Sequence, residues 1–123
     1  MNRNEFIKNY VNITRKVLSC AEKARREGLL SLEDDLDNDK INDRDIFEYG
    51  MRFVVDGTDS RLIDKILSNL ISQEKDEYSL ILKIIQKEAV LMIQDGMNPG
   101  LLYNVLNSYT DLSLKDDEIS GQL

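Results

Sequence analysis

The chain has 123 residues, 41% of them hydrophobic and 32% charged, and its 16 basic and 23 acidic side chains give a formal net charge of −7. This acidic balance argues against nucleic acid as a partner, because phosphate binding depends on lysine and arginine. Histidine, the commonest general base and metal ligand, is absent, so we expect no enzyme, no cofactor and no metal site.

Apolar residues recur at steps of three or four along most of the chain, which is the spacing of one buried face of an α-helix. The sequence has little of the alternation of β-branched and aromatic residues that strands need. The predicted fold is therefore all-α, a compact domain of about five to six helices. We expect these helices at residues 4–27, 29–36, 43–55, 59–73, 78–95 and 99–109.

The first predicted helix ends at Gly28, which can adopt a left-handed C-terminal cap at little steric cost. Leucines after this glycine predict the short second helix, and the polar residues 37–42 are typical of a loop. Asn42 or Asp43 is expected to cap the third helix. The first helix should bury one face, formed by Phe6, Tyr10, Ile13, Val17, Ala21 and Ala24.

The later helices are bounded by the same kinds of residue. Gly57 is expected to stop the third helix, and Thr58 to cap the fourth. Gly96 should close the fifth helix. Asn98 should cap the last helix, with Pro99 at its first position, where the missing N–H costs nothing. Glycines and short polar side chains therefore predict most of the helix ends.

The chain carries no sequence signal for a membrane or an export pathway. No stretch approaches the ~18–20 apolar residues of a membrane-spanning helix, and residues 1–5 lack the apolar core of a signal peptide. A single cysteine, Cys20, excludes an intrachain disulfide and favours a reducing compartment. We expect a cytoplasmic protein, with one domain over 1–109 and an acidic, frayed tail over 110–123.

One acidic stretch has part of the pattern of a calcium-binding loop. Asp35, Asp37 and Asp39 alternate as the first ligands of such a loop do. Lys40 stands where the loop needs glycine, and Ile46 where it needs a bidentate glutamate. The sharp turn and the strongest ligand are both lost, so we interpret this stretch as a solvated acidic loop.

The sulfur-containing residues also have a simple interpretation. Cys20 is predicted one helical step from the buried face, where a packed thiol is expected and a nucleophile without histidine is not. Met51, Met92 and Met97 are predicted in the core or next to it. None of these residues indicates a cofactor site.

Charge is divided unevenly around Gly28. Residues 15–26 hold five basic residues against one acidic residue, and residues 33–45 hold seven acidic residues against two basic ones. The sequence therefore predicts a basic face next to an acidic one. Such a surface can orient a protein partner of matching polarity, although an ordinary charged exterior is the alternative.

Three short stretches resemble the cytoplasmic parts of MotA, the proton-channel subunit of the bacterial flagellar stator, in the MotA/TolQ/ExbB proton channel family. They are Ala-Arg-Arg-Glu-Gly-Leu-Leu-Ser-Leu-Glu at 24–33, Phe-Val-Val-Asp-Gly-Thr-Asp at 53–59, and Ile-Gln-Asp-Gly-Met-Asn-Pro at 93–99. Their order and approximate spacing match those of the family. The membrane helices that the family places between the second and third stretches are missing, which implies a chain without a proton path or torque generation.

The resemblance also implies a site. In MotA-like stators, an arginine three residues before the glycine and a glutamate five residues after it contact the rotor protein FliG. These positions are Arg25 and Glu33 here, and Arg26 is a neighbour that can substitute. We therefore expect a partner-binding surface of Arg25, Arg26 and Glu33, with no catalytic role.

Two functions follow from these observations. The first is a MotA-like flagellar motor protein that binds the rotor protein FliG or stator subunits, in motility or its regulation by chemotaxis. The second is a helical assembly or structural protein that keeps the MotA-like fold for a non-flagellar role. Finding the gene beside flagellar genes would discriminate between them.

The junction at residues 72–77 leaves two conformations open. It contains no glycine or proline and favours helix, so a continuous helix over 59–95, ~55 Å long, is one possibility. That helix could not fold back on itself, and two chains would exchange halves as a homodimer. A hairpin turn is the other possibility, and we favour it because the flanking helices of the stator run antiparallel.

Overall fold

The computed structural model describes residues 1–36 and 45–110. Within these ranges the chain is helical and contains no strand, which confirms the predicted all-α class. Each of the six expected helices is present, although the second is a 3₁₀-helix. The helices are α1 (Arg3–Glu27), η1 (Leu29–Asp35), α2 (Ile46–Val55), α3 (Ser60–Ile71), α4 (Glu77–Gln94) and α5 (Pro99–Asn107).

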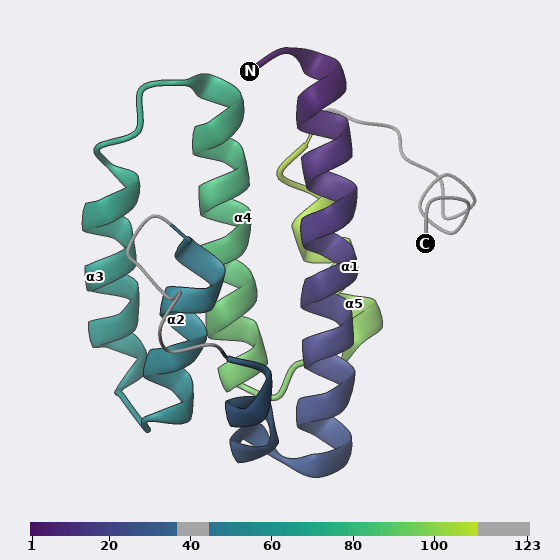
Figure 1. Cartoon of the computed structure of the whole chain (residues 1–123), viewed down its shortest axis with the longest axis vertical. Coiled ribbons are helices and arrows are strands. Elements are labelled where there is room, and N and C mark those ends of the chain that lie inside the picture. The colour runs from purple at the N-terminus through teal and green to yellow at the C-terminus, as the bar shows by residue number, and fades with distance from the viewer. Residues whose placement is uncertain (37–44, 111–123) are drawn as a thin grey trace.

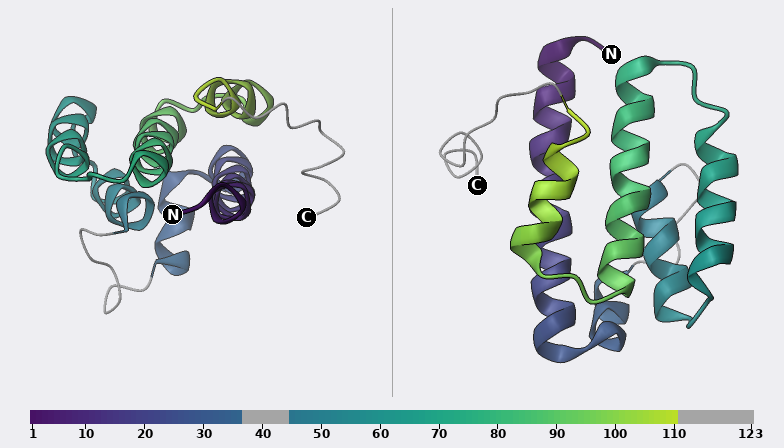
Figure 2. Two further views of the ribbon diagram at one scale, coloured as in Figure 1. Left: turned by 90° about the horizontal axis from the view of Figure 1, so that it is seen from above. Right: turned by 180° about the vertical axis from the view of Figure 1, so that it is seen from behind.

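The helix α4 lies at the centre of the bundle and packs against α1, α2, α3 and α5. Figure 2 shows the same arrangement from above and from behind, with α3 and α5 on opposite sides of α4. The chain descends along α1, α2 and α4 in the view of Figure 1 and ascends along α3 and α5. The turns that follow α1, α2 and α4 therefore meet at one end of the bundle.

The core is a single apolar cluster contributed by every helix. On α1, the expected face is buried at Phe6, Tyr10, Val17 and Ala21, whereas Ile13 and Ala24 are only partly buried. Removing this much apolar surface from water is the main favourable term in folding such a domain. The largest fully buried side chains are Phe6, Tyr10, Val11, Val17, Leu32, Ile46, Met51, Ile63, Leu67, Ile85, Leu102 and Leu106.

Gly28 ends α1 as expected, but with a different backbone conformation. Its φ is 92° and its ψ is 159°, so only φ lies in the range of the predicted left-handed cap. The extended ψ turns the chain directly into η1, where both the amide and the hydroxyl of Ser31 donate hydrogen bonds to the Gly28 carbonyl. The next helix thus determines the conformation of this glycine.

Two predicted N-terminal caps are wrong. Asp45 caps α2 by accepting from the Glu48 amide at 3.1 Å, so this helix begins later than expected; Asn42 and Asp43 lie outside the described residues. Asp59 caps α3 by accepting from the Arg61 amide at 2.8 Å, while the amide of Thr58 donates to the Phe53 carbonyl at 3.0 Å.

Thr58 therefore belongs to the turn that closes α2. The other predicted ends of the later helices are confirmed: Gly57 and Gly96 adopt positive φ, and Asn98 caps α5 ahead of Pro99.

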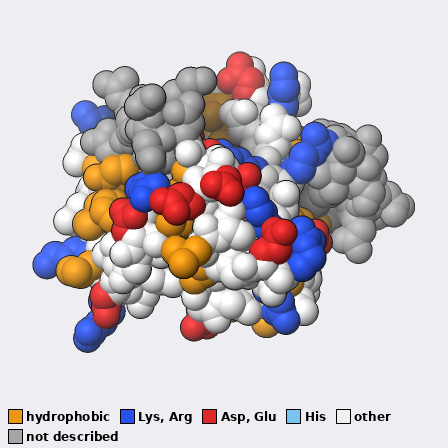
Figure 3. Space-filling model, turned by 60° about the horizontal axis from the view of Figure 1, so that its bottom comes forward, with side chains coloured by type: hydrophobic (Ala, Val, Ile, Leu, Met, Phe, Trp, Pro, Cys, Tyr) orange, Lys and Arg blue, Asp and Glu red, His pale blue; other side chains and the backbone are white. Residues whose placement is uncertain are grey.

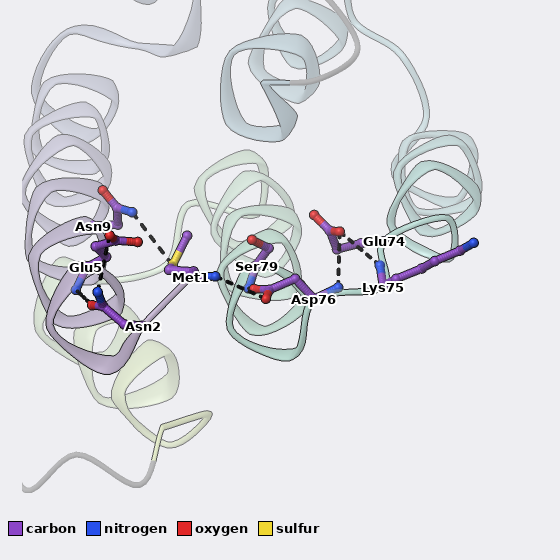
Figure 4. A network of polar contacts seen from close by, with 8 residues as sticks. All are labelled: Met1, Asn2, Glu5, Asn9, Glu74, Lys75, Asp76 and Ser79. Atoms are coloured by element: carbon purple, nitrogen blue, oxygen red, sulfur yellow. Dashed lines mark hydrogen bonds and ion pairs between the residues drawn. The ribbon is translucent and has the colours of Figure 1, made fainter.

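The junction between α3 and α4 is a hairpin turn, so the continuous helix is wrong. The Glu74 carboxylate accepts hydrogen bonds from the amides of Lys75 (2.9 Å) and Asp76 (3.3 Å), as Figure 4 shows. The Asp76 carboxylate then accepts from the Ser79 amide at 2.9 Å and caps α4. These carboxylates accept hydrogen bonds from backbone amides that a continuous helix would pair with its own carbonyls. Local hydrogen bonds therefore override the helix propensity of the segment.

The beginning of the chain is tied to this hairpin. The Met1 ammonium group lies 3.2 Å from the Asp76 carboxylate, and the Asn2 side chain accepts from the Glu5 amide at 2.8 Å to cap α1. The capping hydrogen bond and the ammonium group lower the pKa of Asp76. The starts of α1 and α4 are thus held side by side at the end of the bundle opposite the glycine turns.

A buried tyrosine connects α1 to α5. The Tyr10 hydroxyl is 3.1 Å from Oδ1 of Asn107, and burial raises the pKa of Tyr10 to about 12. In the unfolded chain the phenol ionises near pH ~10, so the unfolded state loses its proton first as the pH rises. We expect wild-type stability to fall relative to the Tyr10→Phe variant between about pH 10 and 12, by about 1–2 kcal/mol.

Urea unfolding of both proteins at several pH values measures this difference. The Phe variant is its own control for the lysines, which titrate in the same range in both proteins. Parallel stability curves for the two proteins would contradict the assignment of Tyr10.

Candidate protein-binding surface

Three turns form one end of the bundle, which we call the turn end: residues 28–29, 56–59 and 95–98. All three contain a glycine with positive φ, at Gly28, Gly57 and Gly96. Two polar contacts tie them together. The Gln94 side-chain amide donates to the Thr58 carbonyl at 2.8 Å, and the Arg25 guanidinium donates to the Gly96 carbonyl at 3.3 Å.

The residues expected to bind a partner, Arg25, Arg26 and Glu33, belong to the end of α1 and to η1 at the turn end. Each has a different neighbour. Arg25 reaches the carbonyl of Gly96. Arg26 has a side chain that is 68% exposed and lies 4.0 Å from Glu27.

Glu33 lies on the other side of η1, facing α2. Its carboxylate is 3.7 Å from the Arg52 guanidinium, which also binds Asp56 at 2.7 Å. Arg25, Arg26 and Glu33 therefore share one end of the molecule without binding one another. Their predicted role in partner binding stays a prediction.

Part of the predicted charge separation is cancelled within the fold. Lys23 of the basic segment binds Asp35 of the acidic segment at 2.9 Å, and Lys16 pairs with Glu48 of α2. The hydrogen bond to Asp35 is the main cause of the raised pKa of Lys23. Figure 3, which brings the turn end forward, shows acidic and basic side chains intermingled over it. Over the described residues of this end, the surface is thus a mosaic of charges.

The other candidate residues lie in ordinary packing environments. Burial is the largest cause of the raised pKa of the half-buried Cys20 thiol, which packs against the core as expected. Met51 and Met92 are buried, and Met97 packs against the core, as predicted. Among the described residues no cluster of His, Cys, Asp or Glu could hold a metal ion.

The acidic stretch considered as a calcium loop is largely outside the structure. Asp37, Asp39 and Lys40 lie outside the described residues. Asp35, the first residue of that pattern, forms the ion pair with Lys23.

Two hollows open at the turn end, and no motif in the sequence indicates either of them directly. One has a volume of about 470 Å³ between α3 and α4 and is lined by Ser60, Arg61, Asp64, Leu91 and Met92. The other has about 260 Å³ between α1 and α4, and we call it the α1–α4 hollow; Ala21, Ala24, Gly28, Leu29 and Ile93 line it, with Arg25. Gln94, Asp95 and Met97 border both hollows.

All three residues that border both hollows belong to the stretch 93–99 of the MotA resemblance. That resemblance was the only hint in the sequence that this segment is more than a helix end.

Over the part of the chain that the structure describes, no helix combines the length and the apolar character needed to cross a lipid bilayer.

Comparison with known proteins identifies relatives that are named Motility protein A. The chain is 37% identical over 100 residues to Motility protein A of Borreliella burgdorferi, which covers 81% of this chain and 36% of that protein. It is 31% and 32% identical over 85 residues to Motility protein A of Treponema pallidum and of Treponema phagedenis, covering 69% of this chain and 32% of each relative.

No protein-family model matches the chain, and no solved structure matches it significantly. The chain spans about a third of the length of the relatives it matches. The expected relation to MotA is nevertheless confirmed, since over most of its length this chain is homologous to Motility protein A.

Proposed function

We propose that this chain is a flagellar motility protein that binds a protein component of the motor, the rotor protein FliG or a stator subunit, through the charged turn end. It acts by binding, without catalysis, proton conduction or torque generation of its own, and it works in the cytoplasm. The observation that carries the proposal is the similarity to Motility protein A over 81% of this chain, which includes most of the residues that build the turn end.

The arrangement of Arg25, Arg26 and Glu33 supports a binding role. Arg26 and Glu33 have side chains that are 68% and 57% exposed, so their charges are available to a partner. Their near neighbours are one carboxylate at 4.0 Å and one guanidinium at 3.7 Å, both longer than a good charged hydrogen bond. A partner with complementary charges can therefore compete for them.

The test is the affinity of the purified chain for FliG, measured by calorimetry. Arg25→Glu is expected to weaken binding at least about tenfold, in the range of truncated interfacial charge contacts. Raising the salt concentration should weaken the wild-type complex, because exposed charges are screened within ~8 Å at physiological ionic strength. The melting temperature should change little, since surface substitutions usually cost within about 0.5 kcal/mol.

Lys75→Glu is the matched control. Lys75 is exposed in the hairpin between α3 and α4, at the opposite end of the bundle, and the substitution changes the net charge equally. Equal weakening by both variants would mean that only the overall charge matters and would refute a site at the turn end. If neither FliG nor stator subunits bind the wild type, the non-flagellar assembly role replaces this proposal.

A further inference from the structure

Hydrogen bonds divide the chain sharply at the junction between α4 and α5. The amides of Gly96 and Met97 donate to two carbonyls at the end of α4, each at 3.0 Å. The side chain of Asn98 instead accepts from two amides of α5, at 2.8 and 3.3 Å. The turn before Asn98 therefore closes α4, whereas Asn98 and α5 form a unit that carries its own cap.

The apolar contact that holds α5 is small. Leu102 and Leu106 are fully buried, whereas Leu101 on the same helix is 54% exposed. Figure 2 shows α5 at the edge of the bundle, and it packs against α1 and α4. A helix of nine residues is too short to be stable by itself, so α5 stays helical and docked only through these contacts.

The remaining contact between α5 and α1 is polar. The Tyr10 hydroxyl is 3.1 Å from Oδ1 of Asn107. Because α1 and α5 run in opposite directions, Thr14, one turn after Tyr10, lies level with Tyr103, one turn before Asn107. Burial is the main cause of the raised pKa of Tyr10, and Thr14 and Tyr103 contribute smaller shifts, so both side chains lie near its hydroxyl.

Thr14 makes the docking of α5 costly. It is the one polar residue among the buried residues that the structure describes, and its side chain is fully buried. Within the same ranges its Oγ1 has no hydrogen-bond partner of good geometry. Burying a hydroxyl without a hydrogen bond is unfavourable, because water would otherwise bind it. Since α5 covers this part of α1, the hydroxyl regains water when α5 leaves.

We propose that α5, together with its cap at Asn98, is a strap that opens from α1 and α4 as one unit while the other helices stay folded. The chain pivots between Met97 and Asn98, where the hydrogen bonds divide. The buried hydroxyl of Thr14 favours the open state, in which water reaches it. Opening uncovers the apolar surface of α1 and α4 on which Leu102 and Leu106 pack. This inference goes beyond the proposed function and requires no partner.

The test is native-state hydrogen exchange of the whole chain, followed by NMR at several low urea concentrations. We expect the amides of 103–107 to share one opening and to be at least about tenfold less protected than those of 85–90 in the central helix α4. Their exchange should also depend less on urea, because opening of α5 exposes much less surface than global unfolding. Equal protection and equal urea dependence of the two segments would overturn the proposal.

Thr14→Val tests the role of the buried hydroxyl. Valine keeps the shape of the side chain and removes the group that lacks a partner, so exchange of 103–107 should slow at least about fivefold. Thr58→Val is the matched control, because it makes the same change in the turn between α2 and α3. It should leave the exchange of 103–107 as in the wild type. Unchanged or faster exchange of 103–107 in Thr14→Val would contradict the proposal.

Two further variants show where the opening occurs. Tyr10→Phe, which removes the hydrogen bond to Asn107, should speed exchange of 103–107 about threefold at neutral pH. Ile63→Val weakens the fully buried contact of α3, which stays folded when α5 opens. It should speed exchange of 85–90 about threefold or more and leave 103–107 unchanged. Equal acceleration of both segments by Ile63→Val would show that α5 opens only when the whole chain unfolds, and would refute the strap.

Discussion

Replacing Leu102 with alanine is expected to destabilise the protein by about 2–5 kcal/mol, the range measured for Leu→Ala in protein cores. Leu102 is fully buried, and it is one of only two fully buried residues on α5. This helix has nine residues and is too short to be stable alone. Its position therefore depends on packing against α1 and α4.

Two measurements check this expectation. Urea unfolding gives the total loss of stability, and hydrogen exchange of the amides of 99–107 shows whether α5 detaches before the rest unfolds. Leu101→Ala is the matched control, because Leu101 precedes Leu102 on the same helix and is 54% exposed. It should change stability by less than about 0.5 kcal/mol. Equal effects of the two variants would mean that α5 is not anchored as the structure shows.

Replacing Gly50 with alanine is expected to destabilise the protein by about 1–3 kcal/mol, even though alanine is the better helix former. Gly50 is buried in α2 where this helix crosses α4 and approaches α3. An added Cβ would lie 2.8 Å from Cγ2 of Val90 and 3.0 Å from Cδ1 of Leu67. Both neighbours are fully buried and cannot move aside without disturbing the core.

A double-mutant cycle isolates this contact. Val90→Ala removes two of the three atoms that approach the added Cβ. The cost of Gly50→Ala and Val90→Ala together should therefore be smaller than the sum of the single costs, by about 0.5–3 kcal/mol. Thermal unfolding of the four proteins provides the measurement. Additive costs would show that the close approach of α2 to α4 is not the reason for glycine at this position.

The sequence alone was sufficient to predict the all-α class, the approximate helix ranges and the relation to MotA. Helix periodicity is a local property, since residues three and four apart face the same side whatever packs against them. The positive φ of Gly57 and Gly96 and the cap at Asn98 were predictable for the same reason, because each depends on residues within one turn.

Two local solutions competed at Thr58 and Asp59, where the predicted cap is wrong, and at 72–77, where the favoured hairpin is confirmed. Thr58 and Asp59 can both cap α3; the Asp59 side chain forms the cap, and the Thr58 amide closes α2. The hairpin at 72–76 competes with a helix of good propensity, and the Glu74 and Asp76 carboxylates decide the outcome. Propensity differences of a few tenths of a kcal/mol per residue are smaller than such capping interactions.

Only the tertiary structure decided the environment of the candidate site. The sequence placed Arg25, Arg26 and Glu33 close together along the chain, but it did not show that Arg25 contacts Gly96. Nor did it show the α1–α4 hollow, whose walls come from residues 21–29 and 93–97. The reason is physical: a periodic pattern shows which face of a helix is buried, whereas contacts between distant segments depend on how all the helices pack together.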